Sequence, residues 1–163
     1  MNKLSKLLKT LDKLPPFLRK IALYYSIGNA VKFAGTAGIQ YIKLNAGEVI
    51  LRLHNRSKVQ NHIGQIHAAA TALLAETATG LMLGIHLPDH KIPLLKTLHI
   101  DYVKRSQGDQ TAHASLAEAD LKRILEDDKG TVVIPVIIKD AVGTEVIAAT
   151  MTWAWIPKNN LKS

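Results

Sequence analysis

Residues 66–83 read IHAAATALLAETATGLML, and Gly84 follows them. This segment is rich in alanine and contains no proline, and a glycine stands where a helix ordinarily stops, so it predicts one long helix. Apolar residues occupy nearly every side of that helix, which indicates that it is buried. A single apolar helix needs a sheet that covers it on most sides.

Short strand-like runs stand on both sides of this helix in the sequence. Two precede it, residues 39–44 and 48–53, with Asn45-Ala46-Gly47 as a hairpin turn. Turn sequences separate four more runs after it, at residues 94–104, 111–119, 131–139 and 145–156. Connections this short require antiparallel pairing, because parallel strands need long crossovers. The sequence therefore predicts an α+β fold in which a curved antiparallel sheet wraps around one long central helix.

Additional helices are expected at the N-terminus. Leucines recur every three or four residues from Leu4 to Leu14, lysines fill the other positions, and Pro15-Pro16 ends the pattern. A second helix is expected at about residues 17–31. A basic amphipathic helix can contact an anionic membrane surface, here through residues 1–16, or it can pack on its own domain.

We therefore divide the chain into a helical extension at residues 1–34, a main domain at residues 35–158 and a tail at residues 159–163.

The composition restricts the classes of function. The chain has 163 residues, which suits one domain, and it contains no cysteine, which excludes disulfides, a thiolate nucleophile and a cysteine zinc site. Its formal net charge of +8 favours anionic partners, such as nucleic acid, membranes or phosphate-bearing cofactors like coenzyme A. No nucleic-acid-binding or metal-binding signature occurs, so neither partner is expected. Without an apolar run of about 18 residues or a secretion signal, we expect a cytoplasmic protein.

Glu76 is an unusual residue for the central helix. The residues three and four positions away are Ala72, Leu73, Thr79 and Gly80, so no cation is available for a helical ion pair. Burial of an unpaired carboxylate is costly and raises its pKa, which is typical of a catalytic acid or base. Alternatively, Glu76 faces solvent or meets an arginine from elsewhere in the fold.

The start of the helix is a second candidate site. The first amide N–H groups of a helix lack partners and carry partial positive charge, so the N–H of Ala68 or Ala69 can polarise a carbonyl group. The alternative is that these alanines only favour the helix and that His67 is structural.

His67 and Glu76 are nine residues apart, about 13.5 Å along a helix and on opposite sides of it. They cannot act on one carbonyl within one chain. A shared site therefore requires at least a dimer, in which the helix N-terminus of one subunit faces Glu76 of another.

A family resemblance rests on this same stretch. In this sequence, Asn61 is followed after five residues by His67-Ala68-Ala69 and after six more by Glu76. This pattern resembles the Asn…His-Gly-Gly…Asp signature of phenylacetate-degradation-type thioesterases, which have the hotdog fold. Residues 98–105 and Gly108-Asp109 are similar to the strand and turn that follow the helix in that group. A thioesterase-like hotdog family of unassigned function is more similar still, over about residues 30–158.

This resemblance implies an acyl-thioester hydrolase whose substrate is an acyl-coenzyme A or an acyl-carrier protein, with no separate cofactor. Glu76 would act as general base or nucleophile, and Asn61 and His67 would complete the catalytic set. The backbone of Ala68 and Ala69 would contact the oxyanion. A homodimer or a dimer of dimers is implied as well.

Two departures from the family pattern concern the rate and the substrate. Ala68-Ala69 replaces Gly-Gly, and the serine that some relatives carry early in the next strand is not matched. Thr97 is the nearest hydroxyl and is the candidate for positioning water. Lys104 and Arg105 follow that strand where relatives often meet the coenzyme, so they are candidates for a phosphate contact or else are simply solvated.

Two other functions fit the same fold. A hotdog module can bind an acyl chain or acyl thioester without turnover. A hydratase is the third hypothesis, but its chemistry usually needs an Asp and a His that converge from a different loop, and the sequence shows no such pair.

Overall fold

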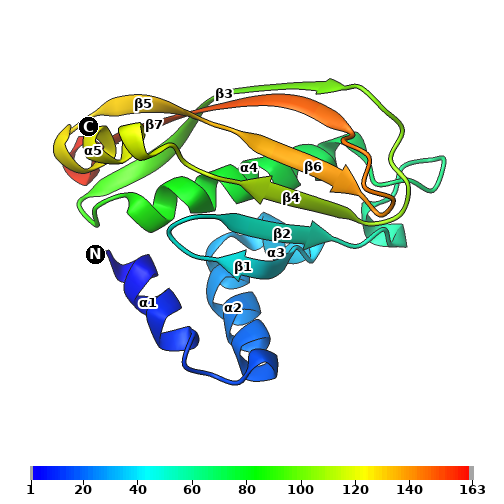
Figure 1. The fold of residues 1–163 in the computed structure, drawn as a ribbon, viewed down its shortest axis with the longest axis horizontal. Coiled ribbons are helices and arrows are strands. Elements are labelled where there is room, and N and C mark those ends of the chain that lie inside the picture. The colour runs from blue at the N-terminus through cyan, green and yellow to red at the C-terminus, as the bar shows by residue number, and fades with distance from the viewer. Residues whose placement is uncertain (1, 162–163) are drawn as a thin grey trace.

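The computed structural model describes residues 2–161 of the chain. A long helix, α4 (Ala68–His86), lies against two antiparallel sheets that curve around it (Figure 1). One sheet has the strand order β1-β2-β4-β6, with bounds Gln40–Leu44, Val49–Leu53, Gln110–Ala114 and Val136–Asp140. The other has the order β3-β7-β5, with bounds Lys91–Tyr102, Ile147–Pro157 and Gly130–Ile134. The predicted α+β arrangement of a curved antiparallel sheet around one helix is confirmed.

The central helix is buried, as its composition predicts. Leu74, Ala78 and Met82 are among its fully buried residues. In the described part of the chain, α4 alone is long and apolar enough to cross a membrane, and it is the core helix on which the sheets pack. The predicted stop at Gly84 is wrong, because the helix continues to His86 and ends where Leu87 turns extended before a proline.

The predicted strand at residues 131–139 is also wrong, because the structure divides it. Pro135 belongs to neither half, since proline has no N–H to donate and interrupts the ladder. The first half, β5, pairs with β7, and the second half, β6, pairs with β4. The chain therefore passes from one sheet to the other at Pro135, which helps the sheet to curve around α4.

A helix that the sequence did not predict follows β4. The strand expected at residues 111–119 ends at Ala114, and α5 (Glu118–Glu126) begins shortly after it. Glu118 and Asp120 lie in its first turn, where acidic side chains favour the helix dipole. The loop between β2 and α4 contains the short 3-10 helix η1 (Ser57–Val59).

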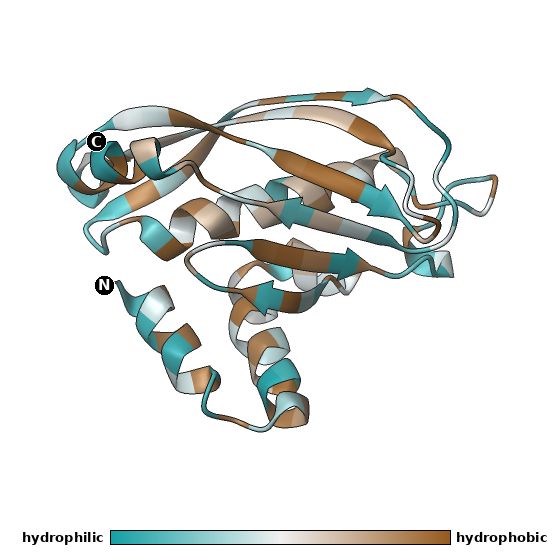
Figure 2. Cartoon of the chain, viewed as in Figure 1, coloured by the Kyte–Doolittle hydropathy of each residue, from teal (hydrophilic) through white to brown (hydrophobic). Residues whose placement is uncertain are grey.

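The N-terminal region forms the helices α1 (Lys3–Leu11), α2 (Pro16–Ala30) and α3 (Lys32–Ala37). The third was not predicted, and the expected domain boundary after residue 34 falls within it. In Figure 1, α1 and α2 project below the sheets. Figure 2 shows apolar residues concentrated on β2, β6 and α2.

The apolar side of α1 packs on its own domain. Leu8 and Leu11 are buried, and α1 contacts α4. The structure thus shows that Leu8 and Leu11 pack on the domain, and membrane contact through residues 1–16 stays a prediction. The last described element is the 3-10 helix η2 (Lys158–Leu161), so part of the expected tail lies there. Residues 1, 162 and 163 lie outside the described residues.

Candidate active site

Asn61 holds the loop that leads into α4. Its Oδ1 atom accepts hydrogen bonds from the N–H of Ile63 (3.0 Å) and of Gln65 (3.1 Å). Gly64 closes the same turn with a φ of 73°, a left-handed conformation that favours glycine. Among the residues that the structure describes, the side-chain amide of Asn61 donates no hydrogen bond, which leaves Nδ2 available to a ligand.

His67 is the N-cap of α4. Its Nδ1 atom accepts a hydrogen bond from the N–H of Ala69 (3.0 Å), so Nδ1 is unprotonated in this arrangement. The prediction that Ala69 supplies an oxyanion contact is therefore corrected, because its amide is already used. Within residues 2–161, the N–H of Ala68 has no hydrogen-bond acceptor, so it is the free amide at this helix start.

One cavity of about 370 Å³ lies at the N-terminus of α4. It brings together four of the predicted site residues, Asn61, Ala68, Lys104 and Arg105. Both basic side chains are exposed at its edge. These four residues therefore surround one cavity within one chain, whereas His67 and Ala69 do not line it.

Sequence reasoning missed several polar residues of this cavity. The Tyr102 hydroxyl donates to the carbonyl oxygen of Ala68 (2.7 Å) and so links the end of β3 to the start of α4. Gln110 is only 1% exposed; its Oε1 accepts from the Thr71 hydroxyl (2.9 Å) and its Nε2 donates to Ser106 Oγ (3.0 Å). A signal for Gln110 was present, because it shares the inward side of β4 with buried alanines two and four residues later.

Glu76 lies in the middle of α4 beside a second cavity, of about 470 Å³. Its side chain is half-buried, and its hydrogen bond from the Thr77 hydroxyl is long, at 3.4 Å. None of the ion pairs found among residues 2–161 includes Glu76. The carboxylate therefore has no cationic partner on its own helix, as predicted, and no arginine from elsewhere in the described chain pairs with it. Burial raises the pKa of the Glu76 carboxyl above its ordinary value.

The two cavities are separate within one chain. Glu76 lines one of them, and Asn61 and Ala68 line the other. This separation agrees with the helix geometry that places His67 and Glu76 about 13.5 Å apart along α4. Thr97 is exposed on β3 and lines neither cavity. Over the described residues, no three His, Cys, Asp or Glu side chains are grouped so that they could hold a metal ion.

Known proteins give two kinds of similarity. A structure from Pseudomonas aeruginosa, described as a protein of unknown function and probable thioesterase, is 21% identical, with a TM-score of 0.74 over 88% of this chain and 97% of that one. A thioesterase from Staphylococcus aureus is 20% identical, with a TM-score of 0.65 over 77% and 99% of the two chains. A thioesterase from Haemophilus influenzae is 14% identical, with a TM-score of 0.66 over 82% and 90%.

These likenesses establish the fold, which is the hotdog fold. No curated protein matches the chain. The family model described as "Domain of unknown function (DUF4442)" matches residues 20–156, which include β1–β6, all of β7 but its last residue, the cavity at the N-terminus of α4, and Glu76. The chain therefore belongs to the DUF4442 family.

Proposed function

We propose that the protein is an acyl-thioester hydrolase that acts on acyl-coenzyme A or acyl-carrier-protein thioesters. The observation that carries this proposal is the half-buried Glu76 carboxylate beside a largely apolar cavity. A carboxylate whose pKa is raised by burial binds a proton more readily near neutral pH, as a general base must. The description of similar folds as thioesterases supports the same activity.

The start of α4 supplies the electrophilic side of the proposed site. The Ala68 N–H points out of a 19-residue helix, whose N-terminal end carries partial positive charge. The Asn61 amide lines the same cavity and adds a second donor. These groups would polarise the thioester carbonyl and stabilise the oxyanion that forms when water attacks it. His67 would act indirectly, by fixing the first turn of the helix.

A homodimer, or a dimer of dimers, would join the two halves of the site. In the described chain, β3 is an edge strand of 12 residues that pairs with β7 alone, and Leu94 and Leu98 are exposed on it. A long apolar edge is usually covered by another strand. A second copy across β3 would bring the α4 N-terminus of one subunit towards Glu76 of the other. Thr97, on the same edge, would then be placed to orient the attacking water.

The charges at the edge of the N-terminal cavity suit a coenzyme A substrate. Lys104 and Arg105 are exposed beside Ala68, and the chain as a whole is basic. Phosphate groups bind such side chains through charge-assisted hydrogen bonds. The coenzyme would thus be part of the substrate, and the reaction as proposed uses no separate cofactor or metal.

The decisive test of the carboxylate is the Glu76→Gln variant in a hydrolysis screen over short, long and aromatic acyl thioesters. We expect the variant to fold and to lose about 10²–10⁴-fold in kcat. Glu126→Gln, an exposed glutamate of α5, is the matched control and should keep full activity. Full activity in Glu76→Gln would remove this carboxylate from the mechanism.

The oxyanion contact has a sharper test in Ala68→Pro. Position 68 is the first residue of α4, where proline is well tolerated, and the change removes the N–H in question while it adds the bulk of the proline ring. We expect a loss of about 10²–10³-fold in kcat. Ala68→Val adds similar bulk but keeps the N–H, so it should retain most of the activity. If both variants lose activity equally, crowding explains the loss and the amide is not required.

A non-catalytic acyl-binding module is the second candidate, because the same cavities can hold a thioester without turning it over. Tight binding of thioesters with no hydrolysis across the whole screen would favour it.

A further inference from the structure

The floor of the cavity beside Glu76 is one side of α4. Glu76, Gly80 and Gly84 are four residues apart and therefore lie along the same side of the helix. The two glycines have no side chains, so the Trp153 ring packs directly onto Gly80 and Leu4 stands near Gly84, and the cavity forms a groove that starts at the carboxylate and is bordered by these residues. From Glu76 to Gly84 the groove runs for eight residues, which is about 12 Å at 1.5 Å per residue.

The walls of this groove come mainly from the N-terminal helices. Leu4 and Leu7 of α1 form one part of them, and Ile27 and Val31 at the end of α2 form another. Trp153 and Pro93 from the sheet and Leu81 of α4 also line it. Among the described residues of the lining, Ser26 and Thr77 are the only small polar side chains beside Glu76. A lining of this kind suits an unbranched apolar chain, because a polar ligand would lose its hydrogen bonds to water there.

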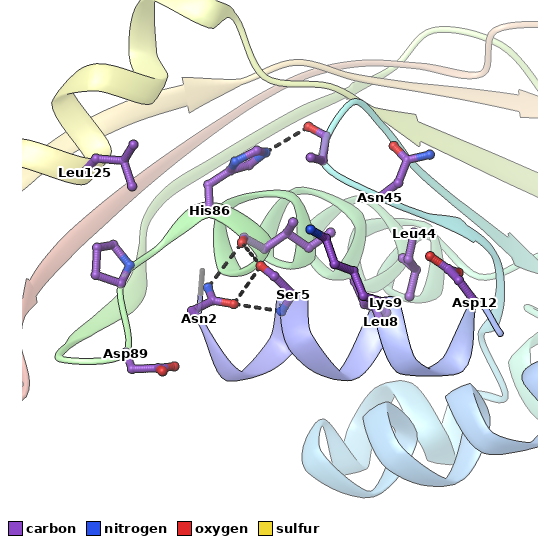
Figure 3. Close-up of a pocket in the computed structure, with 13 residues that line it drawn as sticks. Asn2, Ser5, Leu8, Lys9, Asp12, Leu44, Asn45, His86, Asp89 and Leu125 are labelled. Carbon is purple, nitrogen blue, oxygen red and sulfur yellow. Dashed lines mark hydrogen bonds between the residues drawn. The ribbon is translucent and has the colours of Figure 1, made fainter.

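Leu4 lies at the end of the groove that is remote from Glu76. Its Cδ2 atom lies 3.5 Å from the place where a Cβ on Gly84 would stand. The position of α1 is fixed by polar contacts with the end of α4. Asn2 donates its side-chain amide to the carbonyl of Gly84 (2.7 Å), and Ser5 donates its hydroxyl to that of Ile85 (2.6 Å). Figure 3 shows Asn2 and Ser5 hydrogen-bonded to each other and to the end of α4.

We propose that this groove holds the acyl chain of the substrate, and that Leu4 limits the chain to about ten carbons. A fully extended chain advances about 1.2 Å per bond, so about 12 Å accommodates roughly ten bonds. The N-terminal helices would thus determine which acyl thioesters are accepted. This inference rests on the proposed thioester hydrolysis for its catalytic readout only, since chain binding can be measured separately.

The catalytic test is kcat/KM for acyl-coenzyme A substrates of 4 to 16 carbons. We expect an optimum at about 8–10 carbons in the wild-type protein. Leu4→Ala removes the end wall and should move the optimum to longer chains, while Gly84→Ala adds a methyl group to the floor and should move it to shorter ones. Lys6→Ala, on the exposed side of α1, is the control and should leave the optimum unchanged.

The binding test uses free fatty acids of the same lengths with Glu76→Gln, so that no turnover interferes. Affinity should increase by about fourfold for each added carbon and level off near ten carbons. In the double variant that also carries Leu4→Ala, it should level off at a greater length. If no thioester is hydrolysed but fatty acids still bind with this dependence on chain length, the proposed activity is refuted and the acyl-chain groove is not. A chain-length profile that neither Leu4→Ala nor Gly84→Ala shifts, in folded proteins, would overturn the acyl-chain groove.

Discussion

The two glycines on the floor of the groove should respond to the same substitution in opposite ways. At Gly84, a new Cβ would meet Leu4 at 3.5 Å, an ordinary contact. At Gly80, it would stand 2.7 Å from Cη2 and 2.9 Å from Cζ2 of Trp153, closer than real atoms approach. The Trp153 ring cannot move freely, because its Nε1 donates a hydrogen bond to Thr79 Oγ1 (2.9 Å).

The magnitudes follow from these contacts. Alanine is favoured over glycine inside a helix by about 1 kcal/mol, so Gly84→Ala should stabilise the protein by up to that amount. Gly80→Ala has the same helix gain, but overpacking costs about 1–3 kcal/mol and a broken Trp153–Thr79 hydrogen bond costs about 1 kcal/mol more. The net effect at Gly80 is a destabilisation of about 1–3 kcal/mol.

Thermal unfolding of the two variants beside the wild-type protein measures this difference. For a chain of this size, 1 kcal/mol corresponds to about 2–4 °C in Tm. We expect Gly84→Ala to raise Tm by up to about 4 °C and Gly80→Ala to lower it by at least about 2 °C. Near-ultraviolet circular dichroism should report the shifted Trp153 ring in Gly80→Ala alone. Equal shifts of the same sign would refute the packing of Trp153 against Gly80.

Two further changes test buried polar groups. Burial raises the pKa of Glu76 above its ordinary 4.5, so the folded state binds this proton more tightly than the unfolded state, and stability falls as pH rises from the unfolded pKa through the raised one. Urea unfolding should therefore show Glu76→Gln more stable than wild type at pH 7, with a gap that shrinks towards pH 4; a constant gap would contradict this. Lys91 is 3% exposed, and it donates hydrogen bonds to the carbonyls of Ile124 (3.1 Å) and Asp127 (2.8 Å) at the end of α5. Lys91→Met should therefore lower the free energy of unfolding by about 2–3 kcal/mol. Lys122→Met, at an exposed position, should change it little in the same assay.

The parts of the fold that could be predicted are those with strong local patterns. An alanine-rich segment without proline is a helix in almost any context, so α4 was predictable, and alternating runs revealed the strands. Pro135 carried a readable signal for the break between β5 and β6, since proline cannot donate within a ladder. By contrast, α3 has only six residues, and helices this short depend on packing rather than on propensity. The end of α5 likewise depends on Lys91, which is remote in sequence.

The candidate site divides in the same way. The separation of His67 and Glu76 follows from helix geometry alone, so the sequence was sufficient for it. The loss of Ala69 as a donor depends on the direction of the His67 ring, and a ring rotamer is decided by its surroundings rather than by spacing. The leucine pattern of α1 indicated a packed face, but only the fold shows that this face borders the cavity of Glu76.

The N-terminal helices border both the acyl-chain groove and the Glu76 carboxylate. The raised pKa of Glu76 comes from burial, and the cavity in which Glu76 lies is walled by Leu7 of α1 and Ile27 of α2. The same apolar side chains that would select the acyl chain therefore also help to exclude water from the carboxylate. An acyl chain that fills the groove would remove still more water and raise the pKa further. Substrates that reach Leu4 should on this argument gain in kcat as well as in affinity, whereas short chains leave water beside Glu76 and a weaker base.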